Sequence, residues 1–174
     1  MRKLITAFHI LIILSCGGDD FKPLKENTDR VPGANAVVRK FKASGYSERE
    51  KAWSLISDEA YMFYETDTTK LFKLDLEYYS KGRVTTTVKA EEALLDQNKK
   101  NLKIEKNVKA VSRNGRQLYT QELNWNDAEQ KLRSDKVVLV VYPDGTRIRC
   151  LAGMVADQKL DKLICHQGVM MSSQ

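Results

Sequence analysis

The chain has 174 residues, of which 42% are apolar, and its 29 basic and 23 acidic side chains give a formal net charge of +6. This length fits one domain or at most two, and the apolar fraction is sufficient for a packed core, which argues against a wholly disordered chain. The basic balance alone would be compatible with nucleic-acid binding, but the first residues of the chain argue against it.

Residues 1–15 have the pattern of an export signal. Arg2 and Lys3 precede an eleven-residue stretch that is apolar apart from one Thr and one His. A membrane-spanning helix needs about 20 apolar residues, whereas the apolar centre of a secretory signal peptide has roughly 7–15. The stretch ends in Ile13-Leu14-Ser15-Cys16, which resembles the lipobox of bacterial lipoproteins. The resemblance implies cleavage before Cys16 and lipidation of its thiol; the alternative is a short uncleaved anchor with a chance cysteine.

Cleavage would remove two basic residues, lower the net charge from +6 to +4, and place the remaining chain outside the cytoplasm, where nucleic acid is not an expected partner. Several acyl chains on one cysteine would anchor the protein stably to a membrane. Residues 16–36 are then expected to form the lipidated cysteine and a flexible tether, because they contain two of the three prolines and three of the nine glycines.

The remaining residues, 37–171, repeat with a period near thirty. Ala93-Leu94-Leu95-Asp96 and Leu123-Asn124-Trp125-Asn126 are thirty residues apart, and Met154-Val155-Ala156-Asp157 follows at thirty-one. Turn dipeptides that end in Gly82, Gly115 and Gly145 lie between these blocks. Because glycine accepts positive φ at no steric cost, such dipeptides favour tight hairpins. Each repeat is therefore predicted to be a strand–turn–strand unit.

Apolar side chains alternate with polar ones between these turns. Leu102, Ile104 and Val108 share one parity, whereas polar residues occupy the other, and Leu132 and Val138 continue the pattern one repeat later. This two-residue period is typical of a β-strand with one buried face. The sequence therefore predicts an all-β domain built from repeats of about 30 residues, with one continuous apolar face and two open sheet edges.

No pattern of catalytic residues is present, and we expect no enzyme activity, cofactor or metal. His166 occupies a repeat position that is Glu105 and Asp135 in the other units, so we expect it to face solvent. Cys150 and Cys165 share the inward parity and could form a disulfide outside the cytoplasm. They would lie opposite each other if residues 157–158 formed a two-residue turn; the alternative is a pair of buried free thiols.

Two segments resemble the LptC family of periplasmic proteins that export lipopolysaccharide in bacteria with two membranes. Asp144-Gly145-Thr146-Arg147-Ile148-Arg149, followed by Ala156-Asp157-Gln158-Lys159-Leu160-Asp161, is similar to the last repeat of that family. Ala52-Trp53-Ser54-Leu55, followed by Ala60, is similar to its opening motif, with Ser57 at a position where Ala is usual. Many members keep an N-terminal helix that contacts the transporter, whereas this chain has a lipobox.

The resemblance implies an open, twisted β-jellyroll, as in the related OstA-like proteins, with an apolar groove that shields acyl chains from water. The expected partners are lipopolysaccharide or a related glycolipid, the subunits of an inner-membrane ABC transporter, and a soluble LptA-like jellyroll. The expected location is the periplasm, with the lipid anchor in the inner membrane. The groove residues expected from strand parity are Phe72, Leu74, Leu102, Ile104, Val108, Leu132, Val138, Val140, Ile148 and Leu163.

Open sheet edges suggest how partners would join, because an unpaired strand can extend the sheet of another protein. We expect the transporter at an N-terminal edge strand near residues 53–63, which includes Trp53 and Leu55, and the soluble jellyroll at a C-terminal strand near residues 162–171, which includes Leu163 and Val169. A structural envelope lipoprotein that self-associates through the same edges is the alternative function.

Overall fold

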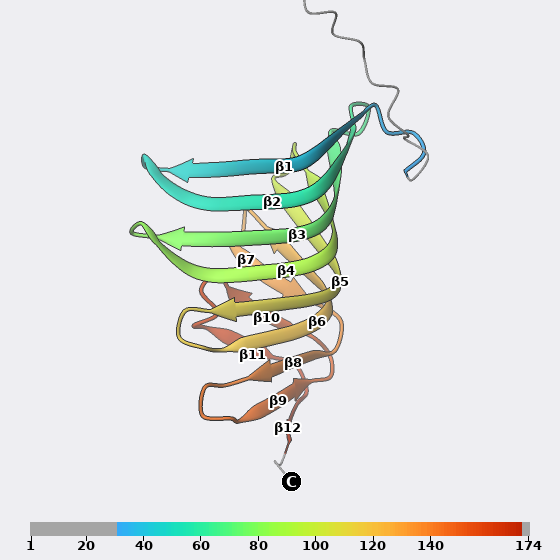
Figure 1. Ribbon diagram of the computed structural model, residues 1–174. Helices are drawn as coiled ribbons and strands as arrows, with labels where there is room; N and C mark the ends of the chain where they lie inside the picture. Colours follow the sequence, from blue (N-terminus) through green and yellow to red (C-terminus); the bar gives the residue numbers. More distant parts are fainter. Residues whose placement is uncertain (1–30, 172–174) are drawn as a thin grey trace, which may run out of the picture.

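The computed structural model describes residues 31–171, which form one antiparallel sheet of twelve strands (Figure 1). This described part contains no helix. The structure confirms the predicted all-β class and is consistent with an open β-jellyroll. The strands are β1 (Ala36–Ser47), β2 (Glu50–Phe63), β3 (Thr68–Ser80), β4 (Arg83–Asp96), β5 (Asn101–Ser112), β6 (Gln117–Asn126), β7 (Lys131–Ser134), β8 (Val138–Val141), β9 (Arg147–Cys150), β10 (Met154–Asp157), β11 (Leu163–Cys165) and β12 (Gly168–Met171).

The strand order follows the chain from β1 to β6 and then divides into two branches. One branch continues through β7, β10 and β11, and the other through β8, β9 and β12. The division occurs because β6 pairs with β7 near its end and with β8 near its start. Figure 1 shows the strands stacked from β1 at one end of the molecule to β9 and β12 at the other.

Each long strand bends near its middle, and the sheet folds into two facing layers along this row of bends (Figure 1). Positive φ angles mark the bends at Lys40, Lys73, Lys106 and Asn107, a conformation that non-glycine residues rarely adopt. We call the two sides of the row the first and the second layer. The first layer consists of residues 41–47, 50–57, 74–80, 83–90, 108–112 and 117–120 with β8, β9 and β12; the second consists of residues 36–39, 59–63, 68–72, 92–96, 101–105 and 122–126 with β7, β10 and β11.

The bend in β3 reverses the alternation of inward and outward side chains. Before the bend Leu71 is buried in the core, and after it Leu74 and Leu76 are, so Phe72 and Lys73 lie between two inward positions of opposite parity. The hydroxyl of Ser57 satisfies the backbone at this point: it donates to the Phe72 carbonyl at 2.7 Å and accepts from the Phe72 N–H at 3.1 Å. A serine at this position therefore has a structural role that alanine could not fill.

The glycine turns lie between strands as predicted, and Gly82, Gly115 and Gly145 all have positive φ. The C-terminal segment differs from its prediction. A single strand over residues 162–171 was expected, but the chain breaks at His166 and Gln167, where Gln167 has a φ of 51°, into β11 in one branch and β12 in the other. The same bend that divides the longer strands therefore divides this one.

Candidate functional site

An apolar cavity of about 420 Å³ lies between the two layers in the N-terminal half of the molecule. This volume is within the range of small-molecule binding sites, roughly 300–1,000 Å³. Both layers supply its walls, because strand alternation turns their inner side chains toward each other. The first layer contributes Phe41, Ala43, Trp53, Leu55, Leu76 and Tyr78, and the second contributes Met62, Thr69, Leu95, Leu102 and Trp125, with Gln97, Lys100 and Asp127 from the adjoining turns.

Aromatic side chains shape this cavity. The rings of Tyr78 and Trp125 meet across the two layers with their centroids 5.5 Å apart and their planes at 45°. The indole of Trp53 lies directly over Gly45 of β1, where an added Cβ would come within 2.1 Å of the indole nitrogen. Glycine at position 45 thus leaves room for the indole at the cavity wall.

Polar groups gather at one rim of the cavity, on the turns after β4 and β6. The Gln97 amide donates to the Thr69 hydroxyl at 3.0 Å, and the backbone N–H of Asp127 donates to the side-chain carbonyl of Asn101 at 3.1 Å. Lys100 also lines the cavity here. Burial, with the nearby Asp127 carboxylate, raises the pKa of Tyr78, so its phenol stays neutral. The site therefore combines apolar walls with a polar rim, which is the arrangement that an amphiphile requires.

In the C-terminal half, large side chains fill the space between the two layers. Leu118, Leu123, Leu132, Val138 and Val140 are all fully buried. The turn between β10 and β11 closes this part from the open side and inserts Leu160, which is also fully buried. The Arg116 guanidinium donates to the carbonyl of Leu160, and the Thr86 hydroxyl donates to the carbonyl of Gln158 at 2.8 Å. These bonds join the second layer to the first across the groove.

The predicted groove residues divide between the cavity wall, the packed interior and, for Phe72, a buried position outside the core cluster. Only Leu102 lines the cavity. Leu74, Ile104, Val108, Leu132, Val138 and Val140 belong to the packed core, and Ile148 and Leu163 are partly buried against it. Phe72 is buried as well, but it lies outside the core cluster, where its ring meets Tyr61 edge-on at 5.5 Å and lies under the ammonium of Lys70. The reversal at Lys73 turns it outward.

Trp53 and Leu55 were expected on an edge strand, and this was wrong. They belong to β2, which pairs with β1 on one side and β3 on the other. The error arose because β1 follows the predicted tether directly, so its contribution to the sheet was not recognised. Both side chains face the cavity instead. The recurrence of large residues at inward positions, such as Leu76 and Tyr78, is the signal that could have identified the wall.

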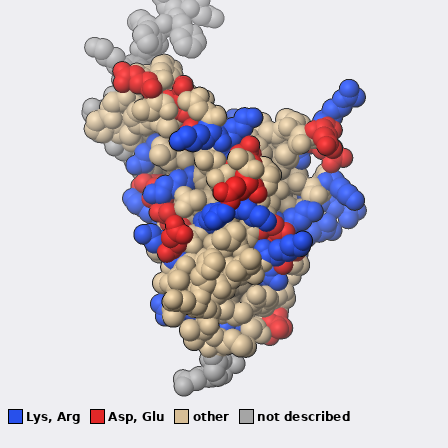
Figure 2. Space-filling model, turned by 180° about the vertical axis from the view of Figure 1, so that it is seen from behind, with Lys and Arg blue, Asp and Glu red and all other residues tan. Residues whose placement is uncertain are grey.

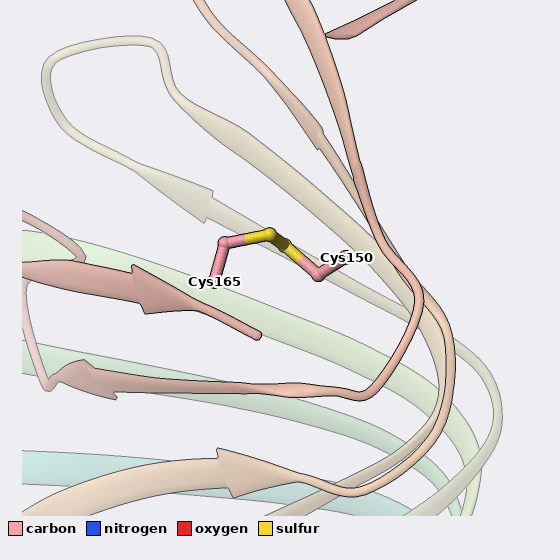
Figure 3. The surroundings of a disulfide bond; sticks show 2 residues. All are labelled: Cys150 and Cys165. Atoms are coloured by element: carbon pink, nitrogen blue, oxygen red, sulfur yellow. A yellow bond between two sulfur atoms is a disulfide. The ribbon is translucent and has the colours of Figure 1, made fainter. Parts of the chain in front are cut away.

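A disulfide joins Cys150 of β9 to Cys165 of β11, with the two Cα atoms 5.2 Å apart (Figure 3). The bond links the two branches of the sheet at the bend, because Cys150 lies opposite Gly168 in one branch and Cys165 lies opposite Met154 in the other. The two cysteines are therefore not partners in one hairpin, as a two-residue turn would have made them. The turn after Asp157 is longer than two residues, because the backbone N–H of Asp157 donates to the carbonyl of Lys162 at 3.1 Å.

Within residues 31–171, β1 pairs only with β2, β11 only with β10, and β12 only with β9. Leu163 and Val169 lie on these last two strands. Side chains here are unusually exposed for apolar residues: Ile164 is 64% and Met170 is 74% accessible. The sheet therefore has unpaired main-chain groups at both ends and an apolar surface at the C-terminal one.

The described residues also bear on the expectations for His166, for metal sites and for membrane-spanning helices. His166 is exposed, as expected, and residues 31–171 contain no cluster of three or more His, Cys, Asp or Glu side chains that could hold a metal ion. None of these described residues belongs to a helix that could span a membrane. Cys16, the predicted lipidation site, lies outside the described residues.

The fold and the cavity define a class of protein: an open β-jellyroll with an apolar interior and free sheet edges. A family model of LptC-related lipopolysaccharide-assembly proteins matches residues 4–167, nearly the whole chain, so the chain belongs to this family. Comparison with curated proteins finds no match. Membership assigns the protein to lipopolysaccharide transport in the periplasmic envelope, within a family of transport proteins rather than enzymes.

Proposed function

We propose that this protein carries the acyl chains of lipopolysaccharide, or of a related glycolipid, in the cavity between its two layers. The apolar cavity with a polar rim is the observation that carries the proposal. Each methylene group moved out of water contributes about 0.8 kcal/mol, so a lipid with several chains needs such a shelter to cross an aqueous compartment. The polar rim would leave the saccharide in water.

Photo-crosslinking tests this placement directly. A photoreactive residue at Leu76 or Leu95, on opposite walls of the cavity, should capture lipopolysaccharide in cells, whereas one at Lys103 on the outer face should not. Equal capture at Lys103 would contradict the proposal. Capture at Val138, which is fully buried, would show in addition that the packed half opens during transport.

In this proposal a lipid on Cys16 anchors the protein to the inner membrane, and residues 17–35 connect the anchor to the jellyroll. The first described residues support a junction near this point, because the N–H of Asn35 already donates to the carbonyl of Met62 at 2.8 Å, and β1 begins one residue later. Incorporation of a labelled fatty acid should be lost in Cys16→Ala. Persistence of the label in that variant would contradict the anchor.

The sheet edges would place the protein within a relay. The edge strand β1 would face the subunits of the ABC transporter, and β11 and β12, with their exposed apolar side chains, would receive a soluble LptA-like jellyroll. Substitution of Val169 and Met170 by Asp should abolish capture of the soluble jellyroll and leave capture of the transporter intact.

The same exposed C-terminal surface favours a second candidate function, a structural envelope lipoprotein that self-associates through its edges. Sedimentation of the purified chain distinguishes the two. A monomer that carries bound glycolipid supports the relay, whereas concentration-dependent polymers with a lipid-free interior support the structural function.

A further inference from the structure

A second hollow, of about 520 Å³, lies where three turns meet. The turn between β3 and β4 supplies Lys81, Arg83 follows on β4, the turn after β5 supplies Arg113, and the turn between β10 and β11 supplies Lys159. The remaining lining residues are Ser80 and Thr85. Since Lys159 belongs to the second layer and the others to the first, the hollow spans the opening between the layers.

None of these four cations forms an ion pair with a carboxylate of residues 31–171. Some lysines elsewhere on the surface do form such pairs: Lys73, Lys89 and Lys103 each have a carboxylate oxygen within 3.0 Å of the ammonium nitrogen. Figure 2 shows one side of the molecule, where blue and red side chains intermingle over the upper part. Ion pairs of this kind involve only some of the basic side chains of residues 31–171, so what distinguishes the four cations is that they line one hollow.

Two hydrogen bonds hold the turns that carry Arg113 and Lys159 in place. The Arg113 N–H donates to the carbonyl of Thr85 at 2.7 Å, which ties the turn after β5 to β4. The Asn114 amide donates to the Asp161 carboxylate at 3.0 Å, which ties the same turn to the one that carries Lys159. The turns that carry Arg113 and Lys159 are thus held beside β4, and an anion bound among the cations would relieve their mutual repulsion.

We propose that this hollow binds a phosphate group on a saccharide. Two guanidinium groups can contact phosphate oxygens through paired N–H donors, and two ammonium groups add point charges. A phosphate, with its multiple oxygens and charge near −2, fits four cations better than a single carboxylate does.

The position of the hollow connects it to the cavity described above. Ser80 of the hollow follows Tyr78 of the cavity wall by two residues, a distance of roughly 7 Å along β3. A glycolipid with its chains between the layers could therefore place a headgroup phosphate among Arg83, Arg113 and Lys159. This part of the inference rests on the proposed glycolipid cargo, whereas the binding of a sugar phosphate does not.

Titration with a soluble probe tests the site without the cargo. The full chain in zwitterionic micelles is titrated with glucosamine 1-phosphate, and the amide resonances of Thr85 and Arg113 are followed by NMR. We expect saturable shifts that are absent with glucosamine. Arg113→Gln/Lys159→Gln should weaken the affinity at least tenfold, and Lys42→Gln/Lys73→Gln, which removes the same charge at exposed sites elsewhere, should leave it within about twofold.

Three outcomes would overturn the inference. Equal weakening by the two double variants would show that only net charge matters. Binding to phosphatidylglycerol vesicles without binding of the soluble sugar phosphate would assign the cations to a membrane surface. Inorganic phosphate bound as tightly as glucosamine 1-phosphate would overturn the saccharide assignment. The crosslinking at Leu76 and Leu95 reports on the cargo separately, so failure there, with sugar phosphate still bound, would reject the proposed function and not this site.

Discussion

The two halves of this jellyroll use the same strand pattern but hold their layers together differently. In the N-terminal half the layers are separated by a cavity, and ion pairs on the outer face, such as Lys70 with Glu92 and Lys73 with Asp58, connect adjacent strands. In the C-terminal half the interior is filled, and a disulfide joins the branches. An open cavity and a filled, cross-linked interior are thus supplied by different parts of one sheet.

The difference has its origin in what crosses the groove. The turn that carries Leu160 spans the C-terminal half and is tied to the first layer by Arg116 and Thr86. In the N-terminal half, the rings of Tyr78 and Trp125 make a contact between the two layers. Side chains that line a void lose the apolar contacts that partner atoms would make. The core of the N-terminal half therefore stabilises the fold less, and a ligand could enter the cavity without displacing a core side chain.

Truncation of a leucine in each half should show this difference most strongly. Leu123→Ala removes a fully buried side chain from the filled interior and should lower the free energy of unfolding by about 3–4 kcal/mol. Leu95→Ala removes a side chain that already borders the cavity and should lower it by only about 1 kcal/mol. Urea unfolding of the full chain in micelles measures both. Equal losses would mean that the layers close together in solution and that the cavity is absent.

Removal of the disulfide should weaken the C-terminal half alone. The cysteines are 15 residues apart, and a cross-link of that span stabilises by about 3 kcal/mol. The double variant Cys150→Ala/Cys165→Ala should lose that amount, and reductant should destabilise the parent chain equally but leave the variant unchanged. Hydrogen exchange should quicken in β11 and β12 and stay unchanged in β2 and β3. Faster exchange throughout the sheet would show that the halves unfold as one unit.

The glycine between β9 and β10 provides a smaller test. In Gly153→Ala the new Cβ would meet the Ser134 carbonyl oxygen at 2.0 Å, and the residue has a φ of 87°. We expect a loss of about 2 kcal/mol in the free energy of unfolding. Gly145→Ala is the matched control: its φ is 86°, but nothing lies within 4 Å of the added atom, so backbone strain alone should cost about 1 kcal/mol. Similar losses would mean that the backbone adjusts around Ser134.

Hydrophobic alternation was enough to predict the all-β fold and the repeat, because the period of two survives within each half-strand. It could not predict the bends. In β5 the inward parity is the same on both sides of Lys106 and Asn107, so Leu102 and Val108 were assigned correctly to one face. In β3 the bend has a single such residue and reverses the parity, which moved Phe72 to the outer face.

The site was harder to predict than the fold, because alternation identifies inward side chains but not the space between them. Val138 and Leu102 have the same pattern, yet one is packed and the other lines the cavity. The deciding contact comes from Leu160, which enters the interior from a turn that looked polar in the sequence. Contacts between segments more than 40 residues apart, such as Arg116 with Leu160, have no local signature.

The smallest effect is expected from the ion pairs of the N-terminal half. Glu92 receives a hydrogen bond from the Lys106 ammonium at 2.6 Å, and the Lys70 ammonium lies 3.4 Å from its other oxygen, so three strands meet at one carboxylate. These cations lower the pKa of Glu92, with the hydrogen bond from Lys106 as the larger cause. Because the pKa is lower in the folded state than in the unfolded one, the contribution is present above the ordinary pKa of about 4.3 and is lost as the pH falls below it.

Glu92→Gln should therefore lower the free energy of unfolding by less than about 1 kcal/mol at pH 7, and the difference from the parent chain should vanish near pH 3. The neighbour Glu91→Gln is the control, since its carboxylate accepts a bond from the Asn107 amide rather than from a lysine. Urea unfolding at both pH values, at low and high salt, separates the two variants. A loss that persists at pH 3 would assign the role of Glu92 to packing, and the layers around the cavity would then be held by strand pairing without help from charge.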